Sequence, residues 1–330
     1  MVGLNKETLN ILITGGAGYI GSHTANTFLD NGHSVTIIDS LINGYSKLIP
    51  KRANFLNCDI ADQEKISLLL NRNEFDVVVH FAGFTRVAES VKDPNKYYDN
   101  NFEKPKLFFD NCLKYSLNKI IFSSTGSIYG NIDKKNILET EKSNPINPYS
   151  KSKHKLEEHL IQLGKEGKMC ATILRYFNVS GADEKMRSGL MSNPDNLIKA
   201  ICEVATQKRE KLIVNGNDYN TKDGTAVRDF IHVSDLAEMH LIAAEELIRK
   251  SETEIFNCGY GKGYSVQDII DTINKILKKK ISFEYGPRRE GDAEYSVADN
   301  KKFVNRFNWK PKYNNLEYIL KTALDWEKNA

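Results

Sequence analysis

The segment Ile11-Leu-Ile-Thr-Gly-Gly-Ala-Gly-Tyr-Ile-Gly21 decides the fold, because a short apolar strand runs into a glycine-rich turn and then into a helix. Gly15, Gly18 and Gly21 permit a tight turn, close approach of the backbone to a pyrophosphate and close helix–sheet packing. The helix N-terminus presents free N–H groups to phosphate. Asp39 ends the next apolar run, where a carboxylate would bind adenosine ribose hydroxyls and repel a 2′-phosphate. The segment therefore predicts a dinucleotide site that prefers NAD to NADP.

Short apolar runs alternate with stretches of helical length through the first half of the chain. The runs cover residues 11–14, 35–38, 55–58, 76–81, 119–123 and 171–176, and the helical stretches cover 19–31, 62–71, 97–115 and 148–164. This alternation indicates a parallel sheet with helices on both faces. We expect an α/β fold: a Rossmann-type doubly wound parallel sheet over 1–180, to which the chain returns around 228–250, and a smaller α/β substrate-binding lobe mainly over 181–330.

Composition narrows the class of protein. Of 330 residues, 40% are hydrophobic and 27% charged, and a net charge of only +3 argues against a nucleic-acid-binding surface. No apolar run approaches the roughly 18 residues of a membrane span, and residues 1–10 lack the apolar core of a signal peptide. Five scattered cysteines form no CxxC pair. We expect a cytoplasmic protein without a metal, a nucleic-acid partner or a membrane partner.

Tyr149 and Lys153 lie four apart in the first turns of a predicted helix, for which Asn147 supplies a cap and Pro148 a first residue. Both side chains therefore share one helix face. A tyrosine pKa is about 10, but an ammonium, the helix N-terminus and an oxidised nicotinamide would all stabilise tyrosinate. The pair then suits a general base that deprotonates an alcohol. A surface tyrosine beside a solvated lysine is the alternative, and the glycine loop favours the catalytic interpretation.

Further candidate residues follow other predicted strands, at the binding edge of such a sheet. Thr125 is expected to share a hydrogen bond with the substrate alcohol and the tyrosine, while Ser123 and Ser124 stabilise the strand end. Asp59, followed by Ile60, is a candidate for the adenine amino group. The cofactor backbone is expected along Phe81, Ala82 and Gly83.

These motifs resemble those of the extended short-chain dehydrogenases/reductases, and within them the UDP-hexose 4-epimerases. The resemblance covers nearly the whole chain and is carried by residues 14–24, 80–83, 97–101, 148–153 (PYSKSK), 175–178 (RYFN), 223–233 (DGTAVRDFIHV) and 287–292 (PRREGD). The glycine loop and the Tyr–Lys pair belong to the superfamily. The last three stretches are more specific to nucleotide-sugar epimerases.

The resemblance implies NAD-dependent 4-epimerisation of UDP-hexoses. Tyr149 would take the proton of the sugar 4-hydroxyl while hydride passes from C4 to tightly held NAD; the 4-keto sugar then turns and takes the hydride back on its other face. The implied cofactor contacts are Gly15, Gly18, Tyr19, Ile20, Asp39, Asp59, Ile60, Phe81, Ala82, Gly83, Asn100, Ser123, Tyr149, Lys153 and Tyr176. The implied substrate contacts are Thr125, Tyr149, Phe177, Asn178, Asn196, Arg228, Arg289, Asp292 and Ser296, with Tyr149, Lys153 and Thr125 catalytic.

The resemblance assigns distinct roles to two parts of the implied substrate site. Arg228 and Arg289 suit a diphosphate, because a guanidinium can hydrogen-bond two of its oxygens. Ser296, four residues after Asp292, stands where epimerases restricted to plain hexoses carry a tyrosine, which implies UDP-GlcNAc and UDP-GalNAc as substrates beside UDP-glucose and UDP-galactose. Tyr295 is adjacent, so a shift of one residue would reverse this inference. The family also implies a homodimer, through helices near 97–115 and 150–163.

Some features depart from the family or from its relatives. Thr85 stands where the family often has a cofactor-binding lysine, with Arg86 next, and the stretch 181–194 is shorter than usual. Nucleotide-sugar 4,6-dehydratases carry Asp-Glu where this chain has Gly126 and Ser127, and decarboxylating relatives that act on uronic acids keep the glutamate, so both are disfavoured. Another NAD-dependent nucleotide-sugar enzyme, such as a UDP-uronate 4-epimerase, remains an alternative. An NAD-binding redox sensor is a non-enzymatic alternative, although such proteins typically lose the tyrosine or the lysine.

Overall fold

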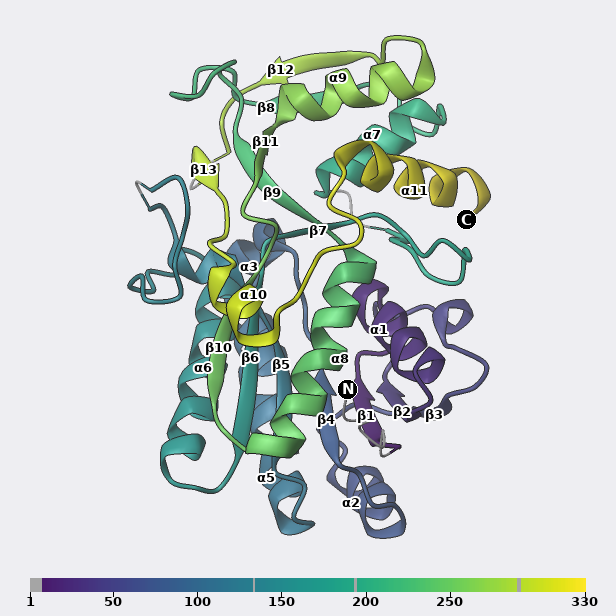
Figure 1. The fold of residues 1–330 in the computed structure, drawn as a ribbon, viewed down its shortest axis with the longest axis vertical. Helices are drawn as coiled ribbons and strands as arrows, with labels where there is room; N and C mark the ends of the chain where they lie inside the picture. Colours follow the sequence, from purple (N-terminus) through teal and green to yellow (C-terminus); the bar gives the residue numbers. More distant parts are fainter. Residues whose placement is uncertain (1–7, 133, 193–194, 290–291) are drawn as a thin grey trace.

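The computed structural model describes residues 8–132, 134–192, 195–289 and 292–330. Within these residues the larger sheet has seven strands in the order β10-β6-β5-β4-β1-β2-β3 (Figure 1), and every neighbouring pair is parallel. The strands are β1 (Asn10–Thr14), β2 (Ser34–Asp39), β3 (Asn54–Asn57), β4 (Val77–His80), β5 (Lys119–Thr125), β6 (Cys170–Tyr176) and β10 (Glu254–Cys258). The Rossmann-type doubly wound sheet is therefore confirmed.

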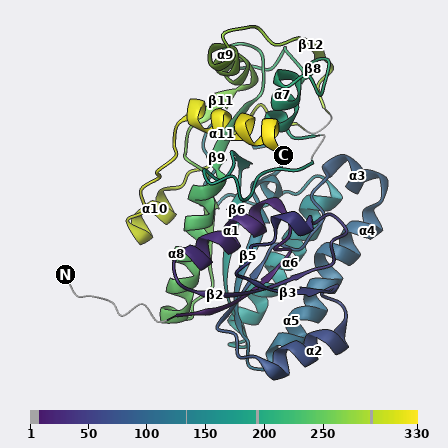
Figure 2. The same ribbon diagram turned by 90° about the vertical axis from the view of Figure 1, so that its right-hand side faces the viewer.

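Helices cover both faces of this sheet (Figure 2). On one face lie α1 (Tyr19–Asp30) and α8 (Val233–Lys250), and on the other α2 (Gln63–Arg72), α5 (Lys104–Lys114) and α6 (Pro148–Lys165). Because both faces are covered, central strands such as β4 consist of continuous buried residues rather than an alternating pattern.

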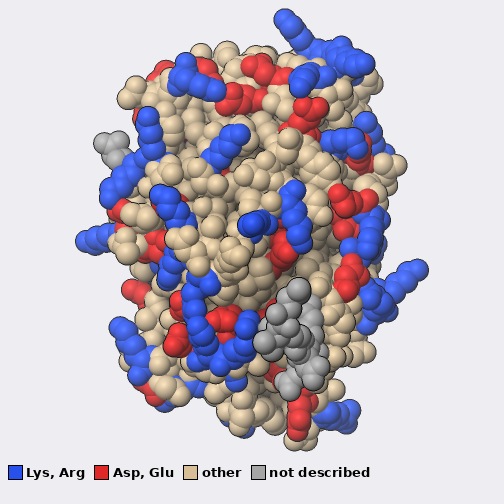
Figure 3. Space-filling model, viewed as in Figure 1, with Lys and Arg blue, Asp and Glu red and all other residues tan. Residues whose placement is uncertain are grey.

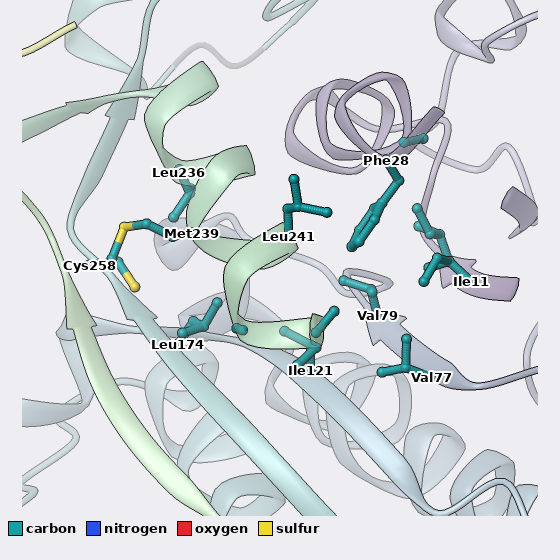
Figure 4. Close-up of a cluster of buried hydrophobic side chains, with 14 of the residues drawn as sticks. Ile11, Phe28, Val77, Val79, Ile121, Leu174, Leu236, Met239, Leu241 and Cys258 are labelled. Atoms are coloured by element: carbon teal, nitrogen blue, oxygen red, sulfur yellow. The ribbon is translucent and has the colours of Figure 1, made fainter. Parts of the chain in front are cut away.

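The core between the sheet and the α1–α8 layer shows how burial holds these elements together (Figure 4). Ile11 of β1, Val79 of β4 and Ile121 of β5 contribute apolar side chains from the sheet, and Phe28 and Met239 contribute them from the two helices. All five are fully buried. Complete burial of side chains of this size stabilises the fold by roughly 1.5–3 kcal/mol each.

The helix predicted over 97–115 is divided in the structure. It consists of α4 (Pro94–Tyr98), one π-helical turn η2 (Asp99–Glu103) and α5, preceded by α3 (Val87–Lys92). Within the π turn, Asn101 Nδ2 donates to Phe84 O at 2.9 Å and Asn101 Oδ1 accepts from Phe84 N at 2.8 Å. This buried side chain replaces backbone partners of the loop after β4, a long-range contact that helix periodicity does not reveal.

The second lobe contains two small sheets. One holds β7 (Asn178–Ser180), β9 (Val227–His232), β11 (Gly263–Ser265) and β13 (Tyr295–Ser296), and the other pairs β8 (Leu212–Asn215) with β12 (Phe283–Gly286). The helices of this part are α7 (Leu197–Ala205), α9 (Val266–Leu277) and α11 (Leu316–Asn329), which share one apolar cluster, and α10 (Lys301–Phe307), which packs near β10. Short 3₁₀ turns are η1 (Ser46–Leu48) and η3 (Gly126–Tyr129).

The stretch 228–250, where we expected the chain to return to the large sheet, has two parts. Strand β9 pairs only with strands of the smaller sheet among the described residues, and α8 then packs on the large sheet before β10 joins its edge. Strand β7, just before the expected boundary at residue 180, already pairs with β9. The division into domains at that residue stays a prediction.

Charged side chains of both signs are interspersed over the face seen in Figure 3. Across the part of the chain that the structure describes, no helix is both long enough and apolar enough to cross a membrane.

Candidate active site

Tyr149 and Lys153 lie in the first two turns of α6. Asn147 Oδ1 accepts from Ser150 N at 2.9 Å and Pro148 occupies the first helical position, so the helix begins where the sequence predicted. Lys153 is buried, and its Nζ donates to the backbone O of Ser123 at 2.9 Å. Burial lowers the pKa of Lys153 to about 8. The two side chains therefore meet the carboxyl end of β5, as a shared helix face requires.

Thr125 is the last residue of β5 and lies beside Tyr149. Its Oγ1 accepts from Ser127 N at 3.1 Å. Burial raises the pKa of Tyr149, and a hydrogen bond with the side chain of Thr125 lowers it by a smaller amount. The sequence led us to expect a stabilised tyrosinate, but in the protein alone desolvation is the larger effect, because it disfavours the charged form of the phenol. Tyr149 is thus held protonated until further positive charge enters the site.

The glycine turn lies against the loop that follows β4. Gly15 has φ +73°, and a Cβ there would lie only 2.5 Å from Ala82 N, so this position requires glycine. Gly18 precedes α1 without a side-chain cap, and the first turn of α1 contains no acidic residue. The N–H groups of that turn are consequently available to an anion, as the sequence predicted.

Asp39 joins the end of β2 to the glycine turn. Its Oδ2 accepts from Ala17 N at 2.9 Å and its Oδ1 from Leu41 N at 2.8 Å. Each carboxylate oxygen can accept a further hydrogen bond. The carboxylate thus stabilises the turn and can still accept from ribose hydroxyls.

A cleft opens beside these groups. Nine of the predicted cofactor residues line it: Gly15, Gly18, Asp39, Asp59, Ile60, Phe81, Ala82, Gly83 and Asn100. Sequence reasoning missed Ile38, Ser40, Ile42, Asn43, Gly44, Cys58 and Phe84, which line it too. The sequence offered one signal, because Ile42 is an apolar residue in the loop that follows Asp39. In the structure Ile42 is 64% exposed. A glycine turn and two carboxylates, those of Asp39 and Asp59, thus line one cleft, as a dinucleotide site requires.

Asp59 and Asn100 reach the cleft with other partners already bound. Asp59 Oδ1 accepts from Ala61 N at 2.9 Å, and its Oδ2 accepts from Lys104 Nζ at 2.7 Å. Asn100 lies in the π turn and donates to Asn101 Oδ1 at 3.0 Å. Their free lone pairs and amide groups remain available to an adenine or a nicotinamide, so both assignments stay predictions.

The catalytic group and the cleft adjoin each other. A Cβ at Gly83, which lines the cleft, would lie 3.3 Å from Lys153 Nζ. Arg86, which follows Thr85, approaches Asp195 with an Nε–Oδ2 distance of 3.7 Å. Lys153 thus lies at the boundary between the cleft and the catalytic group.

Three further predicted cofactor residues are not among the residues that line the cleft. The Tyr19 hydroxyl donates to Gly181 O at 2.6 Å, and Ile20 packs against the main core. Tyr176 is buried in that core, where its hydroxyl hydrogen-bonds His240 Nε2. For Tyr19 and Ile20 the backbone N–H groups at the start of α1 remain the groups that can contact phosphate.

The predicted substrate residues lie mostly on the second lobe, and three of them come together. Arg228 on β9 pairs with Asp292, with an Nη2–Oδ1 distance of 3.3 Å, and Ser296 on β13 lies opposite Arg228 in the strand pairing. Tyr219, missed by sequence reasoning, is buried nearby, and its hydroxyl has no hydrogen-bond partner among the described residues. Burial raises its pKa, which Arg228 and Asp292 also influence. This group offers a cation, an acid and a phenol to a polar ligand.

The remaining predicted substrate residues have separate positions. Arg289 donates through Nε and Nη2 to Asn215 Oδ1 at 3.1 and 3.2 Å, when the amide oxygen of Asn215 faces it. Asn196 caps α7 by accepting from Lys199 N at 3.0 Å. Asn178 begins β7 and is exposed, and the preceding Phe177 is buried. Within the motif at 287–292, Glu290 and Gly291 lie outside the described residues.

Because the Tyr–Lys–Thr group opens onto a dinucleotide cleft, fold and site together define a dinucleotide-dependent enzyme that acts on an alcohol. The model of the NAD dependent epimerase/dehydratase family matches residues 11–259, and the chain belongs to that family.

Individual relatives agree with this family over almost the full chain. The UDP-glucose 4-epimerase of Azospirillum brasilense is 38% identical over 321 residues, 97% of this chain and 92% of that protein. The structure of the UDP-Glc/GlcNAc 4-epimerase from Campylobacter jejuni is 40% identical, with a TM-score of 0.85 and coverage of 98% and 100%. The UDP-glucose-4-epimerase structure from Stenotrophomonas maltophila, with bound NAD and formylated UDP-arabinopyranose, has a TM-score of 0.94 at 32% identity, covering 97% and 98%.

Proposed function

We propose that this protein catalyses the NAD-dependent 4-epimerisation of UDP-hexoses, interconverting UDP-glucose and UDP-galactose. The observation that carries the proposal is the meeting of Tyr149, Lys153 and Thr125 at the carboxyl end of β5, next to Gly83 of the dinucleotide cleft. The relatives described above carry the same activity in their names. Assigning it to this chain agrees with its own side chains as well as with its family.

In this mechanism each residue has a role that its surroundings suit. NAD, when bound, supplies the reversible acceptor of the hydride from the sugar. Tyr149 Oη takes the proton of the 4-hydroxyl and later returns one, and Thr125 shares the hydrogen bond that orients this hydroxyl. The Lys153 ammonium, held by Ser123 O and on the same face of α6 as Tyr149, is the positive charge of this chain proposed to favour ionised Tyr149 in the complete site. The pair thus moves the proton without a net change in the protein.

Inversion also requires that the nucleotide is held firmly while the sugar can turn. Arg228 and Arg289 are suited to hold the diphosphate, and Asp292 is suited to the uridine ribose. In the protein alone Arg228 pairs with Asp292, so this ion pair must rearrange or share its hydrogen bonds when a diphosphate binds. Each of these roles is part of the proposal.

N-acetylated sugars belong to the same proposal. Parallel pairing places Ser296 opposite Arg228 and Tyr295 opposite Val227, and adjacent residues of a strand point to opposite faces. The small serine, rather than the tyrosine, therefore shares the face of the arginine that is expected to bind diphosphate. A small residue there leaves room for an acetamido group, which supports UDP-GlcNAc and UDP-GalNAc as substrates.

The structure also disfavours the dehydratase alternative. A Cβ at Gly126 would meet the Phe177 ring at 3.1 Å, and the Ser127 hydroxyl hydrogen-bonds Thr125 Oγ1 at 3.0 Å. Elimination needs an additional acid and base near the sugar, and neither residue supplies one.

The test is proton NMR of purified protein with UDP-glucose and, separately, with UDP-GlcNAc, adding no NAD. We expect both to give their galacto epimers, because the hydride returns and the cofactor is not consumed. Conversion of UDP-glucose alone would refute the N-acetyl assignment. If neither sugar converts after NAD is supplied, the epimerase proposal fails, and binding of NAD without turnover would favour the redox-sensor alternative.

A homodimer is a further part of the proposal, through the helices near 97–115 and 150–163, which in the structure are α4, η2, α5 and α6. Leu107 on α5 is 48% exposed and so offers an apolar side chain to a second copy of the chain. Light scattering after gel filtration should give twice the chain mass, and Leu107→Glu should lower it. A monomer at micromolar concentration would contradict this proposal.

We also place the enzyme in the cytoplasm. All five cysteines are unpaired thiols, four of them buried, which suits a reducing compartment. Fractionation of the source cells should recover the epimerase activity with cytoplasmic markers.

A further inference from the structure

A buried ion pair that the proposed mechanism does not use lies behind the catalytic residues. Glu157 of α6 is 0% exposed and Arg175 of β6 is 4% exposed. Arg175 Nη2 donates to Glu157 Oε2 at 2.6 Å, and its Nε donates to Oε1 at 3.1 Å. A buried pair is weak evidence for stability, since the cost of desolvation can exceed the attraction. Its position therefore suggests a role other than stability alone.

Glu157 has a third partner, which connects it to the catalytic strand. The hydroxyl of Ser124 donates to Glu157 Oε1. Ser124 lies between Ser123, whose carbonyl accepts from Lys153, and Thr125, which hydrogen-bonds Tyr149. The Glu157 carboxylate thus holds Ser124, and the residues on either side of Ser124 contact the catalytic pair.

Three residues of α6, spaced four positions apart, contact the end of β5. Tyr149, Lys153 and Glu157 follow one another at intervals of four and so lie on one face of the helix. Successive turns of α6 therefore engage the consecutive residues 123–125, through one contact each. This arrangement fixes both the distance of the helix from the strand end and its rotation about its own axis.

A network continues from the arginine and limits its movement. Arg175 Nη1 donates to the Tyr129 hydroxyl at 2.8 Å, and that hydroxyl donates to Asn257 Oδ1 at 2.8 Å. Asn257 N in turn donates to Glu139 Oε1 at 2.8 Å. The ion pair is therefore connected to η3, to β10 and to the loop before α6, all of which surround the strand end.

The charges around the pair define its electrostatic effect. Lys153 faces Glu157 on its own helix, buried His80 from β4 and the ring of Phe122 from β5. Glu157 faces Arg175 from β6, Ser124 from β5 and His154 on its own helix, 3.9 Å away. Burial lowers the pKa of Lys153, whereas the charge of Glu157 raises it. Without that charge the pKa of Lys153 would be lower, so Lys153 would lose its proton at a lower pH.

We propose that Glu157, held by Arg175, is a positioning residue: it fixes Ser123 O and the Thr125 hydroxyl against the Tyr149–Lys153 pair by accepting from Ser124 between them. The inference rests on the proposed function, because it assigns a purpose to the geometry of that catalytic group. Glu157 touches no substrate and acts through its neighbours.

The first experiment compares Glu157→Gln with the wild-type enzyme. We expect kcat to fall about ten- to a hundredfold, the range for a catalytic group that is displaced by about an ångström, with KM for UDP-glucose little changed. The pKa of Lys153, followed by lysine side-chain NMR in cofactor-free protein, should fall below its wild-type value, and the basic limb of the kcat–pH profile should move in the same direction.

Two further variants separate positioning from folding. Ser124→Ala keeps the ion pair and removes only its hydrogen bond to the strand, so kcat should fall about tenfold without loss of folded protein. The matched control is Glu327→Gln, which breaks another buried pair, with Lys199 Nζ at 2.5 Å, between α7 and α11. It should lower thermal stability and leave the pKa of Lys153 and the pH profile unchanged.

The outcomes are distinct from those of the proposed function. If wild-type protein epimerises UDP-glucose but Ser124→Ala keeps full kcat and Glu157→Gln leaves the pKa of Lys153 unchanged, the positioning role is refuted and the epimerase assignment stands. If wild-type protein has no activity, the epimerase assignment fails, while the pKa of Lys153 in Glu157→Gln still reports on the contact. If Glu157→Gln does not fold, the kcat of Ser124→Ala alone tests the positioning role.

Discussion

Ser296 lies directly opposite Arg228 in the parallel pairing of β13 with β9, and the two side chains share one face of the small sheet. Its neighbour Tyr295 lies opposite Val227 on the other face. Sequence alignment alone leaves these two residues open, because a shift of one position exchanges a serine for a tyrosine. The strand pairing selects serine for the face on which the diphosphate-binding arginine is proposed to act.

The first prediction concerns the size of this side chain. In Ser296→Tyr the phenol would occupy the space of an acetamido group, and overpacking typically costs about 1–3 kcal/mol. We expect kcat/KM for UDP-GlcNAc to fall roughly ten- to a hundredfold, while the value for UDP-glucose stays within about threefold. Coupled assays with both sugars measure this ratio. Tyr295→Phe is the control on the opposite face, and an equal loss for both sugars in Ser296→Tyr would contradict the assignment.

The second prediction concerns the proposed base. Tyr149→Phe removes the hydroxyl and keeps the ring, including its edge-on contact with Tyr97 at a centroid distance of 6.5 Å. We expect kcat to fall about 10²–10⁴-fold, the usual contribution of general acid–base catalysis, with cofactor retention unchanged. NMR turnover and the absorbance of co-purified cofactor check the two parts. More than a tenth of the wild-type kcat would exclude Tyr149 as the base.

The third prediction is that the catalytic lysine destabilises the protein at neutral pH. Lowering the pKa of Lys153 from 10.5 to about 8 corresponds to about 3 kcal/mol at roughly 1.4 kcal/mol per pKa unit. The unfolded chain binds this proton more tightly than the folded one, so the cost is fully present below pH 8 and disappears as the pH rises towards 10.5. Lys153→Met, although inactive, should therefore be more stable than wild type at pH 7.

Urea denaturation of cofactor-free protein tests this difference. The gain for Lys153→Met should approach about 1–3 kcal/mol at pH 7, since the hydrogen bond to Ser123 O is lost as well, and should shrink above pH 9. A variant less stable than wild type at pH 7 would show that Lys153 stabilises the fold.

The fourth prediction concerns Asp39, which is proposed to bind the cofactor ribose and which also holds the glycine turn. Asp39→Ala removes a ribose acceptor and also the hydrogen bonds to Ala17 N and Leu41 N that hold the glycine turn. Hydrogen bonds to a charged group contribute about 1.5–3 kcal/mol, so NAD affinity should fall at least tenfold, as calorimetry on cofactor-free protein would show. Asp62→Ala, which removes the cap of α2 with its bond to Lys65 N, is the control and should leave NAD affinity unchanged. An unaltered affinity in Asp39→Ala would refute the ribose contact.

Elements that depend on neighbours in the sequence were predicted well. The glycine turn, the capped start of α6 at Asn147 and the parallel strands before residue 180 follow from local spacing, and all appear in the structure. The π turn at Asp99–Glu103 and the place of β9 in the smaller sheet were not predicted. Both depend on partners far along the chain, namely the loop after β4 and strands β7, β11 and β13.

The candidate site divides in the same way. Gly15, Asp39, Tyr149 and Lys153 were recognisable because a phosphate turn and a helix-face pair have fixed short spacings. Ile42 and Gly44 were missed, since a loop that lines a cleft carries no periodic pattern. Tyr219 was missed because its burial beside Arg228 arises only from the folded second lobe.

By itself the sequence determined the alternation of strands and helices up to about residue 176, the glycine turn and the shared helix face of Tyr149 and Lys153, because these arise from backbone geometry over a few residues. The tertiary structure alone decided that Ser296 rather than Tyr295 faces the side of Arg228, and that Glu157 holds Ser124 between the two catalytic contacts of β5. Both relationships join segments more than thirty residues apart. Such contacts are set by packing of the whole chain, which no local pattern of residues encodes.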